Sequence, residues 1–308
     1  MDILFITLPI FSLIGLGWVG VKLGLLDEGV GGGLSRFVFW LAFPALLLSS
    51  MAKAPPPDDA MAEQIGIWLG VLLTVQFLGR LLAHFAGFNA QSQAGIAMAS
   101  SCANTAFLGT AVLTSLMGPS ILPLVAAFVA VENIIIVGIG VAGLKLAKDA
   151  GLAGKAIGRT FLSGLFNPTS VGALIGFAIS LSGHDLPAPL ARPLEMLGSA
   201  ASPAGLVALG IVMATMTARI TKDWRGTALV VALKCALLPV AMWSAFSFFG
   251  ASTQIIVAAT VLAACPSAVN VFIQARQADV WAEGAATAVF ITTLVSIVGV
   301  SLAAQLAG

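Results

Sequence analysis

Long apolar stretches follow one another along almost the whole chain, separated by short segments rich in glycine, proline or charge. A helix needs about 20 apolar residues to cross the hydrocarbon core of a bilayer. The 308 residues therefore predict an all-α, polytopic membrane protein with ten spans and short loops. The predicted spans are 3–23, 34–52, 61–86, 93–117, 120–146, 160–182, 193–217, 227–249, 253–275 and 284–306.

The composition leaves no room for a sizeable soluble domain. Hydrophobic residues make up 59% of the chain and charged residues 9%, against about 45–50% and about 25% in a soluble domain, and the mean hydropathy is +1.05. The 14 Lys and Arg nearly balance the 13 Asp and Glu, so the chain lacks the clustered basic residues that phosphate contacts need. These values exclude a soluble enzyme and a nucleic-acid partner, and they make the lipid bilayer the expected partner.

The basic residues predict the orientation in the membrane, because cytoplasmic loops collect Lys and Arg. The odd-numbered connections, with the adjoining helix ends, hold 12 of the 14 basic residues, and the even-numbered connections hold Lys53 and Arg192. The odd connections are therefore predicted to be cytoplasmic, and both termini are predicted to lie on the outer side.

The two halves of the chain resemble each other. Pro9 and Pro168 are 159 residues apart, and so are Pro44 and Pro203. With five spans per half, the second half enters the membrane in the opposite direction, which predicts an inverted repeat. Transporters with inverted repeats bind substrate near the bilayer midplane.

The fourth and ninth spans carry small, polar and helix-weakening residues near their middle, in residues 100–110 and 263–272. Each is the fourth span of its half. Interrupted helices occur at membrane depth only where they are buried in protein or line a cavity. The helix N-termini at such breaks favour an anion, because they present free amides and a partial positive charge.

Several strings resemble the auxin efflux carrier family, within the bile acid/arginine transporter superfamily, and they run from the first span to the ninth. They are Leu8-Pro9-Ile10-Phe11, Leu23-Gly24-Leu25-Leu26-Asp27, Leu34-Ser35-Arg36-Phe37-Val38-Phe39, Pro44-Ala45-Leu46-Leu47, Asn104-Thr105-Ala106-Phe107-Leu108-Gly109, Asn167-Pro168 and Cys265-Pro266-Ser267-Ala268-Val269-Asn270. The chain looks like a bacterial member, which implies the inner membrane. The resemblance also implies auxin-like, malonate-like or malate-like carboxylates as substrates.

The same resemblance implies two inverted five-helix repeats, with helices four and nine broken and crossing at the substrate. Residues 1–52 and 160–217 would form a scaffold domain, through which the chain would form a homodimer. Residues 60–146 and 227–307 would form a transport domain. One departure concerns the fourth span: the family often has a proline there, whereas this chain has none between Pro57 and Pro119. That span is therefore expected to be only locally unwound.

Asn104 and Asn270 are the first candidates for substrate binding, with Thr105, Pro266 and Ser267 beside them. An amide supplies two donors and an acceptor, so it can hold a carboxylate without burying a full charge. The competing interpretation is that these groups only cap broken backbone or bond across helices, as polar residues in membranes often do.

Glu132, Asn133 and Lys234 are candidates for ion coupling. Glu132 is the only acidic residue deep in a span, where a charge costs about 2.5–3.5 kcal/mol, so it is either a proton or cation site or a structural carboxyl bonded to its neighbours. Lys234 lies inside the eighth span, and either reaches the cytoplasmic interface, pairs with Glu132, or attracts the anion. No cofactor or metal site is predicted, and coupling to protons or sodium stays open.

The leading functional hypothesis is a secondary carrier of small organic anions that works by alternating access. No ATP-binding loop of the Gly-x-x-x-x-Gly-Lys-Ser/Thr type occurs, so an ion gradient or the membrane potential must supply any driving force. The alternative is a sodium-coupled symporter of the bile acid type. An intramembrane hydrolase is disfavoured because the Gly-x-Ser-x-Gly motif is absent, and a channel is disfavoured because one compact polar cluster suits a carrier better than a lined pore.

Overall fold

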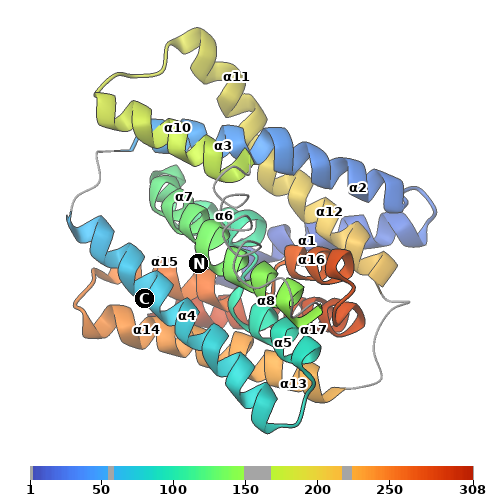
Figure 1. The fold of residues 1–308 in the computed structure, drawn as a ribbon. Coiled ribbons are helices and arrows are strands. Elements are labelled where there is room, and N and C mark those ends of the chain that lie inside the picture. Colours follow the sequence, from blue (N-terminus) through green and yellow to red (C-terminus); the bar gives the residue numbers. More distant parts are fainter. Residues whose placement is uncertain (1–2, 55–58, 149–167, 217–223, 308) are drawn as a thin grey trace. The chain divides into compact units, whose positions relative to one another are not determined.

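The computed structural model describes residues 3–54, 59–148, 168–216 and 224–307, and within these ranges it contains helices, an isolated β-bridge and no strand (Figure 1). The start of the predicted span 160–182, with Asn167, and the end of the predicted span 193–217 lie outside the described residues. The chain divides into two compact units built from distant segments. The first comprises Met1–Ile65, Ala106–Val131 and Leu165–Thr215, and the second comprises Gly66–Thr105, Glu132–Gly164 and Met216–Gly308.

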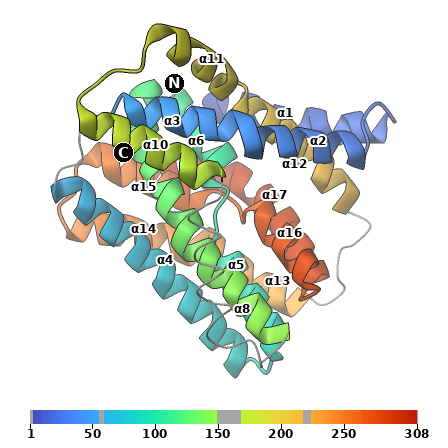
Figure 2. The ribbon, with the colours of Figure 1, turned by 45° about the horizontal axis from the view of Figure 1, so that its top comes forward.

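Helices of the first unit pack closely at small residues. They are α1 (Ile3–Lys22), α2 (Glu28–Phe37), α3 (Phe43–Ala52), α6 (Thr110–Met117), α7 (Leu122–Val131), α10 (Pro168–Ser182), α11 (Ala188–Ser199) and α12 (Ala201–Met216). The helices α3 and α10 lie side by side (Figures 1 and 2). A Cβ atom on Gly172 would lie 2.5 Å from the carbonyl oxygen of Pro44, and one on Gly176 would lie 2.5 Å from that of Leu48. Glycine therefore lets the two backbones approach, as it does in other membrane helix pairs.

The described part of the second unit contains two π-helical segments within longer helices. Its elements are α4 (Asp59–Phe85, from Gly66 onward), α5 (Ala90–Ser101), η4 (Glu132–Val137), α8 (Gly138–Lys148), α13 (Trp224–Val231), η7 (Ala232–Leu237), α14 (Leu238–Phe248), α15 (Thr253–Ala264), α16 (Val269–Ala278) and α17 (Ala282–Ala307). The π-helix η4 continues α7, and η7 joins α13 to α14. Such π turns occur frequently at functional sites, and Glu132 and Lys234 lie in these two.

The glycines 31–33 lie within a helix and not in a turn between the first two spans. They belong to α2, whose first turn is capped by Asp27: the Asp27 side chain accepts a hydrogen bond from the amide of Val30 at 2.8 Å. A Cβ atom on Gly31 would lie 2.6 Å from the Ile211 side chain. Gly31 thus allows α2 to pack closely on α12. The Asp27 cap explains why the helix starts before the glycines.

Six helical stretches among the described residues are long and apolar enough to cross a membrane. They are Glu28–Ala52, Asp59–Phe85, Pro119–Lys148, Ala188–Thr215, Trp224–Phe248 and Ala282–Gln305. Shorter apolar helices are Leu8–Lys22, Thr105–Met117, Pro168–Ser182 and Thr253–Ala264.

The predicted starts at 34 and 193 are too late, since α2 begins at Glu28 and α11 at Ala188. Proline is tolerated in a first helical turn, so Pro187 and Pro189 do not delay α11.

Candidate substrate site at two paired helix breaks

Two helices of the second unit are interrupted, and their broken segments pair with each other. The helix α5 ends at Ser101 and α15 ends at Ala264, and the next residues, Cys102 and Cys265, have ψ angles of 108° and 150°. Ala103 and Ser267 then form an isolated antiparallel β-bridge. The predicted span 93–117, which lacks a proline, is thus interrupted at residues 102–104 and resumes as a helix at Thr105.

Backbone hydrogen bonds across the breaks explain why this interruption is tolerated. The amide of Asn104 donates to the carbonyl oxygen of Pro266 at 2.8 Å, and the amide of Ala268 donates to that of Cys102 at 3.0 Å. A buried backbone group without a partner costs about as much as a lost hydrogen bond. Each break therefore satisfies groups that the other break has released from its helix.

Glu132 supports the first break with both carboxylate oxygens. Its Oε1 accepts from the amide of Ala103 at 3.0 Å, and its Oε2 accepts from the hydroxyl of Thr105 at 3.0 Å. The side chain is 3% exposed and begins the π-helix η4. Glu132 is thus a carboxyl bonded to its neighbours. It accepts the hydrogen bond that the amide of Ala103 would otherwise donate to a carbonyl oxygen within a continuous helix.

Ser267 supports the second break and is itself supported by a residue that the sequence analysis missed. Its hydroxyl donates to the carbonyl oxygen of Ala99 at 2.7 Å, and its amide donates to the hydroxyl of Thr292 at 3.1 Å. Thr292 lies in α17, 160 residues after Glu132. That spacing is close to the 159-residue offset of the paired prolines, and this signal could have identified Thr292 as the counterpart of Glu132.

Lys234 is fully buried, so the interpretation that it reaches the cytoplasmic interface is wrong. Its ammonium donates to the carbonyl oxygen of Ala263 at 2.7 Å, in the last turn of α15. Carbonyl groups in the last turn have no helical donor and carry the negative end of the helix dipole, which explains why a cation binds there. Lys234 takes part in neither described ion pair, which join Lys53 to Glu195 at 2.6 Å and Lys148 to Asp279 at 3.7 Å.

Asn104 differs from its neighbours because its side chain retains an unused donor. The residue is 4% exposed, and its Nδ2 atom is buried without a hydrogen-bond partner among the described residues. By contrast, the side chains of Thr105 and Ser267 already bond to protein groups. The break thus contains one buried amide with donors available to a ligand.

Asn270 and Asn133 lie beside the paired breaks rather than within them. Asn270 is half-buried in the first turn of α16, where its Oδ1 accepts from Nε2 of Gln274 at 3.3 Å. Asn133 is half-buried and follows Glu132 in η4. The structure therefore brings Asn104, Thr105, Glu132, Pro266 and Ser267 together at the bridge, and Lys234 contacts the same region through Ala263. No described hydrogen bond joins Asn270 to that bridge.

Thr292→Val is expected to destabilise the protein by about 1–3 kcal/mol, because it leaves the buried amide of Ser267 without an acceptor. The change conserves shape, so cavity formation contributes little. Thr293→Val is the matched control: Thr293 is equally buried, but its hydroxyl donates only within α17, to Val289 at 2.7 Å. Thermal unfolding of the purified variants checks this prediction, and equal midpoints for the two would contradict it.

Comparison with known proteins agrees with the membrane character of these helices. The sequence model of the family described as "Membrane transport protein" matches residues 3–303. A protein of Rhizobium meliloti named "Putative malonate transporter" is 29% identical over 303 residues, which cover 96% of this chain and 93% of that protein. An "Uncharacterized transporter" of Methanothermobacter thermautotrophicus is 25% identical over 301 residues, covering 96% and 95% of the two chains.

The family match reaches into both units and includes all or most of each of the six stretches that are long enough to cross a membrane. The resemblance to the auxin efflux carriers is thereby confirmed, and the chain is a transport protein rather than an enzyme. The chain belongs to the membrane transport protein family of auxin efflux carriers and is a multi-pass membrane protein.

Proposed function

We propose that this protein is a secondary carrier of small organic anions, with dicarboxylates of the malonate type as the first candidates. The substrate would bind at the paired breaks of α5 and α15. The name of the Rhizobium meliloti relative supports the substrate class. The chemistry of the breaks supports it as well, since uncharged donors beside helix N-termini suit an anion.

The unused donor of Asn104 is the observation that carries this proposal. A buried donor without an acceptor is costly, and a carboxylate, which only accepts hydrogen bonds, would satisfy it. Asn104 directly precedes the π-helix η2 (Thr105–Gly109), and the positive end of a helix dipole favours an anion. Asn270 of α16 would contribute a second amide from the other break.

The proposed architecture has ten spans in two inverted repeats. The six long stretches and four shorter apolar helices fall at the ten predicted spans. Further support comes from the offset between Glu132 and Thr292, and from Gln76 and Lys234, which are 158 residues apart. Glu132 and Thr292 each accept a hydrogen bond from a backbone amide at a break. In the second pair, Lys234 donates to the carbonyl oxygen of Ala263 at the end of α15.

We propose alternating access as the transport mechanism. Residues 60–146 and 227–307 would move against a scaffold of residues 1–52 and 160–217, which would also carry a homodimer contact. The termini would lie on the outer side of a bacterial inner membrane, as the distribution of basic residues predicts.

Glu132, Asn133 and Lys234 are the proposed coupling residues. Glu132 touches Thr105 and the backbone of the break, so a change in its protonation would alter the contacts next to Asn104. Lys234 places a positive charge against the end of α15, which favours an anion nearby. Proton coupling is therefore the first proposal, and sodium coupling in the manner of bile acid symporters is the alternative.

Asn104→Ala is expected to weaken carboxylate binding about tenfold or more, because a hydrogen bond to a charged group contributes about 1.5–3 kcal/mol. The measurement is a thermal-shift titration of the purified protein with mono- and dicarboxylates, followed by uptake into proteoliposomes. Asn89→Ala is the matched control: it removes the same amide from the N-cap of α5, where Asn89 accepts from the amide of Ser92 at 2.8 Å.

The control separates lost binding from lost stability, since a missing N-cap costs about 1 kcal/mol without touching the break. Equal affinities of the parent and Asn104→Ala would refute the site. Repeating the titration with sodium, potassium or choline as the cation, and uptake with an imposed pH gradient, distinguishes sodium coupling from proton coupling.

A further inference from the structure

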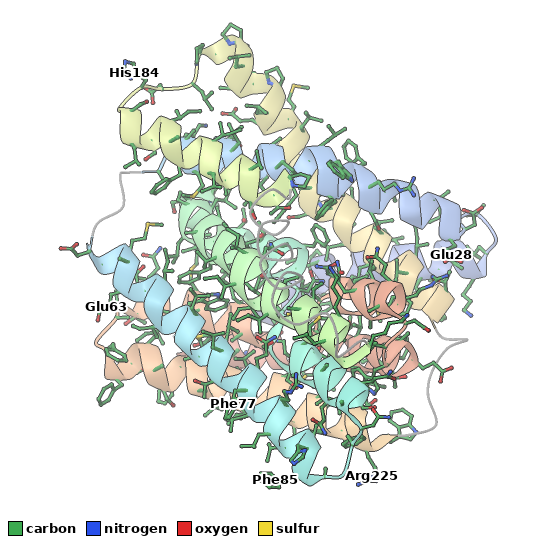
Figure 3. All side chains as sticks on the ribbon, viewed as in Figure 1. Glu28, Glu63, Phe77, Phe85, His184 and Arg225 are labelled. Atoms are coloured by element: carbon green, nitrogen blue, oxygen red, sulfur yellow. The ribbon has the colours of Figure 1, made fainter. Side chains whose placement is uncertain are left out.

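A groove of about 350 Å³ lies in the second unit between α4, α5 and α8. Leu73 and Phe77 of α4 and Ile139 of α8 supply its apolar wall. Phe77 is 65% exposed and extends outward from α4 (Figure 3). Because α4 and α8 belong to stretches that are long and apolar enough to cross a membrane, this exposed apolar wall is suited to contact with lipid.

Arg80 places an unpaired positive charge in the groove. The residue is exposed, and among the described residues its guanidinium has no hydrogen-bond or ion-pair partner. A Cβ atom on Gly143 would lie 3.7 Å from Nη1 of Arg80, so the guanidinium lies beside a position of α8 that has no side chain. Arg80 is five residues from the end of α4, or about 8 Å along the axis. A long cationic side chain this close to the end of a membrane-spanning helix can reach the level of the lipid phosphates.

Gln76, one helical turn from Arg80, offers the groove a hydrogen-bond acceptor. Its Nε2 donates to the carbonyl oxygen of Ile136 at 3.3 Å, which assigns the other amide atom as oxygen. This Oε1 atom is buried and has no partner among the described residues, and the residue is 6% exposed. Buried polar atoms are normally hydrogen-bonded, so this acceptor favours a donor group from outside the protein.

We propose that this groove binds the head group of a membrane phospholipid. Arg80 donates to the phosphate, Gln76 accepts from a hydroxyl or ammonium group of the same head group, and an acyl chain lies along Leu73 and Phe77. Phosphatidylglycerol and phosphatidylethanolamine carry such a donor, whereas the quaternary ammonium of phosphatidylcholine has no N–H. The site is independent of the transport function proposed above.

The test is a thermal-shift titration of the purified protein in detergent with phosphatidylglycerol, phosphatidylethanolamine, phosphatidylcholine and inorganic phosphate. The first two lipids are expected to raise the unfolding midpoint, and phosphatidylcholine and phosphate are expected to raise it little. Arg80→Gln should weaken the apparent affinity for phosphatidylglycerol about tenfold or more, since it removes a charge-assisted contact. Arg36→Gln, which removes an exposed arginine from α2, is the matched control and should behave as the parent.

Gly143→Leu provides a second variant that keeps Arg80 but fills the groove, and it should also abolish the lipid-dependent shift. Gln76→Leu should remove the preference for phosphatidylethanolamine over phosphatidylcholine. The proposal is overturned if inorganic phosphate alone reproduces the shift, if phosphatidylcholine stabilises the parent as strongly as the other two lipids, or if Arg80→Gln and Gly143→Leu respond as the parent does. Bound lipid counted by native mass spectrometry gives an independent readout.

Discussion

Replacing Gly17 with leucine is expected to prevent stable folding of the first unit, because α1 and α12 are in backbone contact at this position. A Cβ atom on Gly17 would overlap the carbonyl oxygen of Val207 and would lie 3.0 Å from the amide nitrogen of Ile211. Neither atom can rotate away as a side chain does. Overpacking of a core typically costs about 1–3 kcal/mol and occasionally more, and contacts with backbone atoms place this substitution at or above the upper end.

The contact is reciprocal, which strengthens the expectation. A Cβ atom on Gly210 of α12 would overlap the carbonyl oxygen of Ile14 of α1. Membrane helices commonly associate through such small residues, and separating the pair would lose the close packing along both helices. The large expected effect therefore arises from geometry rather than from the loss of a single favourable contact.

Gly15→Leu is the matched control in the same helix, because a Cβ atom on Gly15 would meet nothing within 4 Å. The yield of monodisperse protein and its thermal unfolding midpoint measure both effects. The Gly17 variant should give little folded protein, and the Gly15 variant should resemble the parent. Similar midpoints for the two variants would show that α1 and α12 are not in the described contact.

Glu132→Ala is expected to destabilise the second unit by about 1–3 kcal/mol or more. The substitution leaves the buried amide of Ala103 without its acceptor, which costs about 1–3 kcal/mol, and it also removes a contact of the Thr105 hydroxyl. Because the amide of Ala103 lies in the break after α5, the loss should also disturb the paired bridge to Ser267. Thermal unfolding of the detergent-purified variant measures the effect.

Glu132→Gln should lose about half as much stability. The amide oxygen can still accept one of the two hydrogen bonds, whereas the amide NH2 group faces the other partner as a donor. Glu63→Ala, at an exposed position of α4 (Figure 3), controls for removal of a carboxylate and should change little. If Glu132→Ala unfolded at the parent's midpoint, the carboxylate would not be the support of the first break.

The sequence determined the membrane class, the family and the position of both helix breaks. Hydropathy is a local property, so a run of about 20 apolar residues identifies a span without knowledge of its neighbours. Local composition also identified the polar clusters around Asn104 and Ser267, because polar groups at membrane depth are costly. The division into scaffold and transport domains, the ten-span inverted repeat and the roles of the site residues stay predictions.

Partners across helices were decided by the tertiary structure. The sequence did not show that Ala103 pairs with Ser267, that Thr292 supports Ser267, or that Lys234 binds the end of α15. It also did not show that Asp27 starts a helix through residues 31–33, or that Glu132 supports the break in the fourth span.

The physical reason is the same in each case. The sequence shows which buried polar groups would cost free energy without a hydrogen-bond partner. Which residue provides that partner depends on which distant segment packs against the group. A proline is one way to open a helix, and an acceptor supplied by Glu132 from another helix is another. The sequence therefore determined where backbone and side-chain groups would need partners, whereas only the packing of α5, α15, α17 and η4 decided which residues provide them.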